Sequence, residues 1–233
     1  MKRELTNRIR FVLEELVPPL LRDSGLFRRL TSIASRGDSD RFARFRQQAA
    51  FLSPADYAAL YQDYRNIHSG TDNSQACIDR VLAEAIGPDI CDIGCGSGAM
   101  LRDLAARAPV GTTLTGLDIA PPPVTEQGAV HIEAGEITSI PFGDRSFDTV
   151  ICTHVLEHVL DIRLAISELR RITRRRLIIV VPQEREAIYN FNPHFHFFPY
   201  PHSFLRVMHP IPDRHDCALI GRDIYYREDR DGA

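Results

Sequence analysis

Short apolar runs alternate with segments of helical periodicity after residue 75, and this alternation constrains the fold more than any other feature of the 233-residue sequence. Alternating strand and helix units build a parallel sheet with helices on both faces. The run RLIIVVP is apolar after its first residue, as expected of a strand covered on both sides. We therefore predict an α/β fold with a doubly wound, mostly parallel sheet. Strands are predicted at 89–93, 112–119, 129–134, 147–155 and 176–182, and helices at 78–87, 98–108 and 161–172.

The two ends of the chain have different patterns. Residues 217–228 predict either a hairpin that turns near Gly221 and Arg222 or one long strand. The first 75 residues predict helices only, and Ser53 followed by Pro54 is typical of a helix start. We therefore divide the chain into a helical lid over the substrate site, 1–75, and a cofactor-binding catalytic domain, 76–233. Apolar residues recur at helical spacing at Leu5, Ile9, Leu13 and Leu16, before Pro18 and Pro19 end the run.

Composition excludes several classes of protein. Apolar residues make up 44% of the chain and charged residues 25%, as in an ordinary globular protein. A formal net charge of -3 argues against a nucleic-acid binder. Five cysteines without regular spacing favour a reducing compartment over a disulfide framework. No signal-peptide core or apolar run of membrane-spanning length is found, so we expect a cytoplasmic protein without an integral membrane segment.

A glycine-rich loop with a preceding acid defines the expected ligand site. Gly94, Gly96 and Gly98 follow the strand 89–93, at the first strand-to-helix loop, where doubly wound sheets bind ligands. Asp92 would oppose the pyrophosphate of a dinucleotide, but it suits a cation. S-adenosylmethionine carries an ammonium and a sulfonium group and no phosphate, so Asp92 favours this cofactor. Asp118, about 20 residues further on, is placed to bind the ribose of any adenosine cofactor.

Two other interpretations of the loop stay open. The spacing from Gly94 to Ala99 also satisfies a loose nicotinamide fingerprint, which would indicate an oxidoreductase. Glycines also form ordinary structural turns, and a non-catalytic cofactor-binding protein would keep the same motif. Asp92 disfavours the nicotinamide alternative, because its charge repels phosphate.

Four segments carry a resemblance to a known family. DICDIGCGSG, LTGLDI, GEITSIPFGDRSFDTVICTHVLEHV and ISELRRI resemble successive motifs of class I S-adenosylmethionine-dependent methyltransferases, in particular the small-molecule subgroup that includes quinone methylases. The resemblance covers about Ile78 to Pro182. The N-terminal segments LVPPLLRDSG and HSGTDNSQACIDR resemble a bacterial subgroup linked with cell-surface polysaccharide assembly. This family implies an enzyme that methylates a small-molecule acceptor, such as a sugar hydroxyl, and releases S-adenosylhomocysteine.

The resemblance also implies roles for single residues. Asp92 and the three glycines would hold the methionine part of the cofactor, and Asp118 its ribose. Ile119 would pack on the adenine, Glu136 would accept a hydrogen bond from its amino group, and Thr153 would lie beside the methionine part or the substrate. Two positions depart from the family pattern: Glu136 stands where aspartate is frequent, and TRRR at 173–176 replaces a glycine-containing turn. We expect an exposed turn there.

Histidines form the expected acceptor side. His154, Glu157 and His158 are spaced to meet on one side of a helical turn, and His196 follows the strand 176–182 at the ligand edge. One interpretation makes His154, His158 or His196 a catalytic base. A second joins His154, Glu157 and His158 with His194 or His196 in a divalent metal site, which we do not favour. A third makes the cluster structural.

Overall fold

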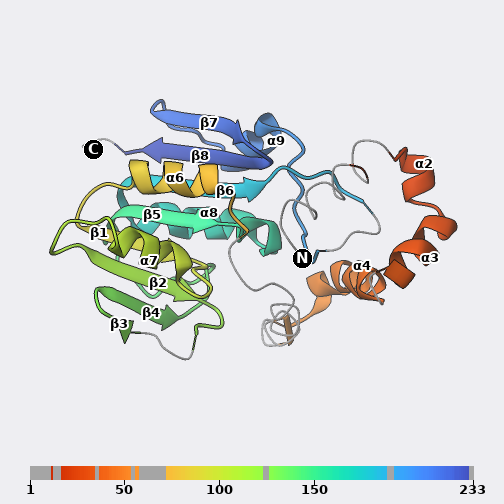
Figure 1. Ribbon diagram of the computed structural model, residues 1–233, viewed down its shortest axis with the longest axis horizontal. Coiled ribbons are helices and arrows are strands. Elements are labelled where there is room, and N and C mark those ends of the chain that lie inside the picture. The colour runs from red at the N-terminus through yellow and green to blue at the C-terminus, as the bar shows by residue number, and fades with distance from the viewer. Residues whose placement is uncertain are drawn as a thin grey trace.

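The computed structural model describes residues 12, 17–34, 37–53, 56–57, 72–122, 126–187 and 192–230. They contain one eight-stranded sheet in the order β3-β4-β2-β1-β5-β6-β8-β7 (Figure 1). The five strands from β4 to β6 run parallel, while β3, β7 and β8 pair antiparallel with their neighbours. The predicted fold class is therefore confirmed. The strands are β1 (Asp89–Ile93), β2 (Thr113–Asp118), β3 (Glu126–Gln127), β4 (Val130–Ala134), β5 (Phe147–Thr153), β6 (Thr173–Pro182), β7 (His215–Ile220) and β8 (Asp223–Asp229).

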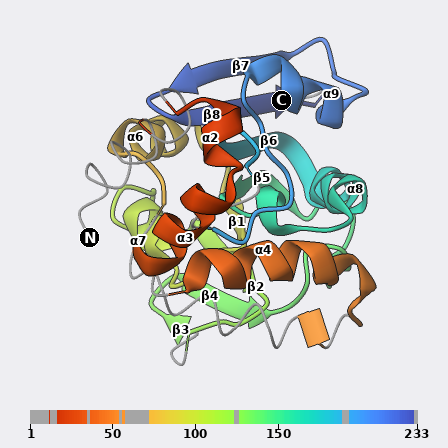
Figure 2. The ribbon, with the colours of Figure 1, turned by 90° about the vertical axis from the view of Figure 1, so that its right-hand side faces the viewer.

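Helices cover both faces of the sheet (Figure 2). One face carries α6 (Gln75–Glu84) and α7 (Ala99–Ala105), and the other carries α8 (Ile162–Ile172) and α9 (Pro201–Met208). The helix α8 begins where Asp161 accepts a hydrogen bond from the backbone N–H of Leu164, as an N-cap should. Every third or fourth residue of α8 is buried, so one stripe of the helix enters the core. These buried residues are Ile162, Ala165, Ile166, Leu169 and Ile172.

Two expectations about strands are resolved by the C-terminal part of the sheet. Residues 215–229 form a hairpin that turns at Gly221, with a left-handed φ of 65°. The expectation of an exposed turn at 173–176 was wrong, because these residues are the start of β6. Their guanidinium groups pair with acids of neighbouring strands, Arg174 with Asp148 at 3.0 Å and Arg176 with Asp229 at 2.6 Å. Charge pairing across the sheet therefore allows a basic run to extend a central strand.

Helices from the N-terminal part lie beyond the carboxyl ends of the parallel strands (Figures 1 and 2). Side chains tie them to the segment after β6: Arg46 donates to the carbonyls of Asn192 and Ala187, and Phe45 contacts Phe195 with 5.2 Å between ring centroids. Arg22 is buried and donates to the carbonyl of Glu186. These elements are α2 (Pro19–Arg22), α3 (Gly25–Ala34), α4 (Asp38–Gln48) and the short 3₁₀ helix η2 (Ala49–Phe51).

Some N-terminal expectations lie outside the described residues, namely the helix through Leu5, Ile9, Leu13 and Leu16 and the position of Pro54. The Ser53 hydroxyl does accept a hydrogen bond from the backbone N–H of Asp56, as a cap would. Within the described part of the chain, no helix combines the length and the apolar character needed to cross a bilayer.

Candidate active site

The glycine loop connects β1 to α7 and turns sharply. Gly94, Gly96 and Gly98 have φ values of 76°, 56° and 78°, in the left-handed region that only glycine adopts without strain. Space is also limited, because a Cβ on Gly94 would lie 2.2 Å from Cγ2 of Val155. Gly98 is the N-cap of α7. The loop therefore presents bare backbone at the carboxyl edge of the sheet.

Asp92 is buried immediately before this loop. Its residue is 2% exposed, and its Oδ1 has no hydrogen-bond partner among the described residues. Burial, followed by the nearby charge of Asp118, raises the pKa of Asp92 to about 7. A buried carboxylate oxygen without a partner is costly in isolation, and a bound cation would offset that cost.

Asp118, the last residue of β2, holds the loop in place. Its Oδ2 accepts a hydrogen bond of 2.7 Å from the backbone N–H of Gly96, and its Oδ1 accepts one of 2.9 Å from Ala120. β1 and β2 pair in parallel, so Asp92 and Asp118 end adjacent strands at the same edge. This carboxylate therefore links the glycine loop to the end of the neighbouring strand.

The residues expected beside the adenine follow the next strand ends. Ile119 is half-buried directly after β2, and Glu136 is exposed two residues after β4. The backbone turns back there, with the N–H of Ser139 donating to the carbonyl of Glu136. Burial, with a contribution from the charge of Glu136, raises the pKa of Tyr57. Tyr57 thus lies near this end of the site.

The end of β5 carries the first histidine in an unusual conformation. β5 ends at Thr153, two residues earlier than expected, and His154 has a φ of 55°. The His154 Nδ1 lies 3.5 Å from Oε1 of Glu157, and its Nε2 lies 3.5 Å from Oδ1 of Asp223. Burial disfavours the charged ring, but these carboxylates outweigh burial and raise the pKa of His154. Two carboxylates beside the imidazole favour its protonated form, which suits a positioning role better than that of a proton acceptor.

His158 has the opposite electrostatics. It ends the 3₁₀ helix η3 (Leu156–His158), and burial together with neighbouring His194 lowers its pKa to about 4. Glu157 is more fully buried, yet the nearby histidines hold the pKa of this carboxyl at about 2. Glu157 is therefore ionised, and His158 is neutral, at neutral pH.

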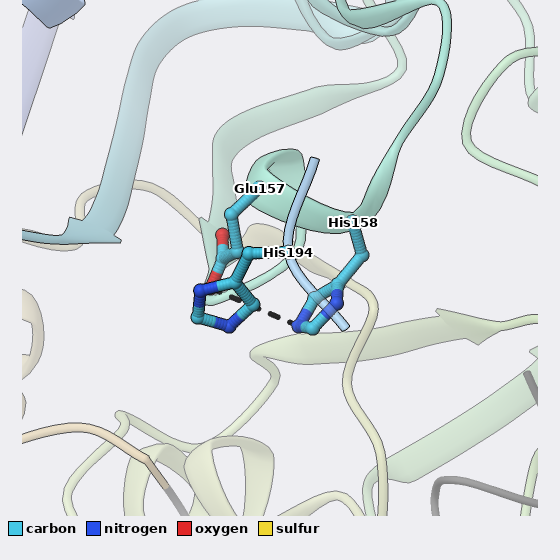
Figure 3. Close-up of side chains that lie close together, drawn as sticks. All are labelled: Glu157, His158 and His194. Atoms are coloured by element: carbon cyan, nitrogen blue, oxygen red, sulfur yellow. Dashed lines mark ion pairs between the residues drawn. The ribbon is translucent and has the colours of Figure 1, made fainter. Parts of the chain in front are cut away.

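His194 joins this cluster from the segment after β6. Its ring centroid lies 4.6 Å from that of His158, edge to face. Figure 3 shows Glu157, His158 and His194 pointing toward one another. On its other side, the Nδ1 of His194 lies 2.5 Å from Oε2 of Glu184, and both residues are buried. Two segments distant in sequence thus build one polar cluster. It consists of His154, Glu157 and His158 after β5 and of Glu184 and His194 after β6.

His196 lies outside the cluster. Its Nε2 donates a 2.8 Å hydrogen bond to the carbonyl of Val159, and its ring stacks on Phe198. It lines a hollow of about 340 Å³ together with Arg163 and Arg206. The structure therefore places the side chains of His154 and His158 beside Glu157, whereas His196 reaches Glu157 only through its backbone N–H and directs its side chain elsewhere.

Comparisons with known proteins match this architecture. A family model described as a methyltransferase domain matches residues 91–181. The chain is 34% identical over 112 residues to the ubiquinone biosynthesis O-methyltransferase of Paracidovorax citrulli, covering 44% of this chain and 45% of that protein. It is 25% identical over 121 residues to the ubiquinone/menaquinone biosynthesis C-methyltransferase of Geotalea daltonii, covering 46% and 52%. The matched part thus spans about half the length of these relatives.

Residues 91–181 match a methyltransferase domain, and the sheet that contains them has the fold of class I methyltransferases. A solved structure of the same fold is magnesium protoporphyrin IX methyltransferase from Synechocystis with bound S-adenosylhomocysteine, with a TM-score of 0.51, 18% identity, and coverage of 74% of this chain and 94% of that one. S-adenosylmethionine is the cofactor of such a domain. The Asp92 oxygen, which the described residues leave without a partner, and the bare glycine loop fit its cationic, phosphate-free methionine part.

Three residues at the edge of the methyltransferase site escaped sequence reasoning. Asn73 donates a 2.9 Å hydrogen bond to the Thr153 hydroxyl, so the residues just before α6 contact the end of β5. Asp223 starts β8, whose antiparallel pairing with Pro182 brings it to the carboxyl edge. Glu184 is an acid two residues after β6, and this strand-end position, like that of Asp118, was the signal that could have identified it.

Proposed function

We propose that the chain transfers the methyl group of S-adenosylmethionine to a hydroxyl of a small-molecule acceptor. The observation that carries this proposal is a buried oxygen of Asp92 that has no hydrogen-bond partner in the described part of the chain. It lies beside a carboxylate that anchors the glycine loop, within a segment that matches a methyltransferase domain. Asp92 and Asp118 end neighbouring strands, so one extended adenosine cofactor can contact both.

The proposed roles of the cofactor-binding residues follow their places along the edge. Asp92 binds the ammonium group, and Asp118 accepts from the ribose hydroxyls. Bound S-adenosylmethionine supplies a methyl group on a sulfonium, which is a good leaving group for in-line displacement at carbon. The chain aligns the reactants, and alignment can lower a barrier by about 7–11 kcal/mol. In addition, Gly94, Gly96 and Gly98 flank the methionine part, Ile119 and Glu136 contact the adenine, and Thr153 lies beside the methionine part.

The acceptor would enter between the polar cluster and the N-terminal helices. We assign 1–75 as a lid and 76–233 as the catalytic domain on the basis of the Arg46 and Phe45 contacts with the segment after β6. The rings of Phe45, Tyr57 and Phe195 lie within 6.0 Å of one another and form an aromatic wall suited to an acceptor with apolar faces.

Among the histidines, His158 offers a neutral ring, because its pKa is lowered to about 4, so a ring nitrogen can accept a hydrogen bond from an acceptor hydroxyl or bind a cation. His154 positions Glu157, and His196 lines the neighbouring hollow.

Cofactor and acceptor assays test the proposed function. Calorimetry should detect binding of S-adenosylmethionine and S-adenosylhomocysteine but not of NAD. Incubation with S-adenosylmethionine and a panel of hydroxyl, amine and enolisable carbon acceptors should add one methyl group to a hydroxyl compound, detected by mass spectrometry. Methylation of carbon or nitrogen alone would correct the acceptor class. Binding of NAD in place of S-adenosylhomocysteine would overturn the proposal and favour an oxidoreductase. Cofactor binding without any turnover would indicate a binding protein.

Cofactor affinity should depend on pH through Asp92. Since its pKa is about 7 in the free protein, the carboxylate is mostly protonated at lower pH and must lose that proton to bind the ammonium group. We expect S-adenosylhomocysteine affinity to fall about tenfold from pH 8 to pH 6, with proton release detected by calorimetry in two buffers. Asp92→Asn should bind more weakly and lose this dependence. A pH-independent affinity in the unmodified protein would contradict the assignment.

The raised pKa of Asp92 also predicts how the free energy of unfolding of the cofactor-free protein depends on pH. A carboxyl group whose pKa is raised on folding binds its proton more tightly in the native state. The contribution of Asp92 to the free energy of unfolding is therefore fully present below its ordinary pKa of 3.8 and is lost as the pH rises through about 7.

Replacing His158 with alanine should lower turnover by roughly 10²–10⁴ while leaving S-adenosylhomocysteine affinity near wild type, because the ring faces the polar cluster and not the glycine loop. Single-turnover kinetics and calorimetry measure the two effects. His202→Ala is the control, since His202 is exposed and stacks on Tyr200. Undiminished turnover of His158→Ala would show that the cluster plays no chemical part.

A further inference from the structure

Three side chains of metal-ligating types lie close together, namely Glu157, His158 and His194. One potential ligand atom from each lies within 4.8 Å of the other two. Glu157 and His158 come from η3 after β5, and His194 comes from the segment after β6, so the fold itself converges them (Figure 3). The sequence left His194 and His196 as alternative partners of Glu157 and His158, and the structure places His194 in the cluster.

The carboxylate of Glu157 is the second observation that points to a ligand. Its side chain is 1% exposed, and neither of its oxygens has a hydrogen bond of good geometry among the described residues. The nearest ring nitrogens are those of His154 at 3.5 Å and of His158 at 4.0 Å, both longer than a close hydrogen bond. A buried carboxylate is stabilised by a cation or by several short hydrogen bonds. The long ion pair with His154 compensates this carboxylate only in part, and no short hydrogen bond reaches it from the described residues.

The outer contacts of the two histidines match those of metal ligands. Glu184 contacts the Nδ1 of His194 at 2.5 Å and is itself held by the side-chain amide of Asn192. A carboxylate on one ring nitrogen fixes the tautomer and leaves the other nitrogen as the ligand. The ring of His158 is hydrogen-bonded to the Pro193 backbone, which has only a carbonyl to offer, so one nitrogen of His158 also remains an acceptor.

We propose that Glu157, His158 and His194 bind one divalent transition-metal ion of the zinc type. Two imidazoles and one carboxylate suit this class of ion better than magnesium or calcium, which prefer oxygen ligands only. Metal–ligand bonds of about 2.0–2.2 Å require a contraction of the cluster by on the order of 1 Å. Three protein ligands leave a coordination position open, as in catalytic zinc sites.

The open position would lie on the acceptor side of the site, at the ends of β5 and β6. A hydroxyl coordinated there would lose its proton more readily, because a bound divalent cation lowers the pKa of its oxygen ligand. This consequence rests on the proposed function, whereas the metal site itself does not.

Metal content of the untagged full-length protein tests the site. After growth with zinc, manganese, iron, cobalt and nickel, and passage over a chelating resin, elemental analysis should find about one transition-metal ion per chain. Replacement by cobalt should give d–d absorption bands typical of low-coordinate nitrogen and oxygen ligation. His194→Gln and Glu157→Gln should each lose the ion, and Glu184→Gln should weaken binding about 10- to 100-fold.

Matched controls separate this result from misfolding and from metal bound elsewhere. His131→Gln and His202→Gln alter exposed histidines outside the cluster and should keep the ion. S-adenosylhomocysteine binding and the melting temperature report whether each variant folds. The proposal is overturned if the unmodified protein holds no ion after cobalt or zinc loading, or if folded His194→Gln retains the unmodified protein's content. Either result would make the cluster an ion-pair network.

Discussion

Alanine at position 118 is expected to reduce S-adenosylhomocysteine affinity by at least roughly 10- to 150-fold, the loss of about 1.5–3 kcal/mol that one charge-assisted hydrogen bond would give. The loss should exceed that of a ribose contact alone, because Asp118 also accepts from the backbone N–H groups of Gly96 and Ala120. Without it, the glycine loop loses its anchor to β2. Calorimetry on Asp118→Ala measures the effect.

Two further variants make this result specific. Asp118→Asn keeps one acceptor oxygen and should recover part of the affinity. Asp161→Ala removes the N-cap of α8 and should lower stability by about 1 kcal/mol without changing cofactor affinity. Equal affinity of Asp118→Ala and the unmodified protein would mean that the ribose binds elsewhere.

Gly94→Ala is expected to impair both folding and cofactor binding. A left-handed φ costs an alanine about 1–2 kcal/mol, and the contact of its Cβ with Val155 adds about 1–3 kcal/mol of overpacking. For a chain of this size the sum lowers the melting temperature by roughly 5–15 °C. Moving Val155 also displaces the loop that leads to η3, so S-adenosylhomocysteine binding should weaken in parallel.

Gly111→Ala is the matched control, because Gly111 has a φ of 93° but nothing within 4 Å of its added Cβ. It should show the backbone cost alone and bind cofactor normally. Combining Gly94→Ala with Val155→Ala should restore the packing part of the loss. If Gly94→Ala and Gly111→Ala were equally stable and equally active, the close approach of Val155 would be unimportant.

The central sheet could be predicted because its signals are local. β1, the glycine loop, β2 and α8 each carry an apolar period, a turn residue or a cap within their own residues. The start of β6 could not, since Arg174 and Arg176 form a strand only through acids on β5 and β8. The hairpin at Gly221 stayed undecided for a related reason, because its pairing with β6 is a tertiary contact.

The site divides in the same way. Asp92 and Asp118 follow predictable strands, so their meeting at one edge was foreseeable. Asp223 became visible only with the strand order, whereas Glu184 could have been identified from its place after β6. The spacing of His154 and His158 did not indicate that the pKa of one ring would be raised and that of the other lowered. That difference arises from burial and from which carboxylates face each ring.

The segment after β6 contacts both the N-terminal helices and the polar cluster. Its Asn192 carbonyl accepts from Arg46 of α4, while the Asn192 side-chain amide holds Glu184, which in turn contacts His194. One residue therefore connects the N-terminal helices to the polar cluster. Mutations of Asn192 are expected to affect the packing of α4 and the position of Glu184 together.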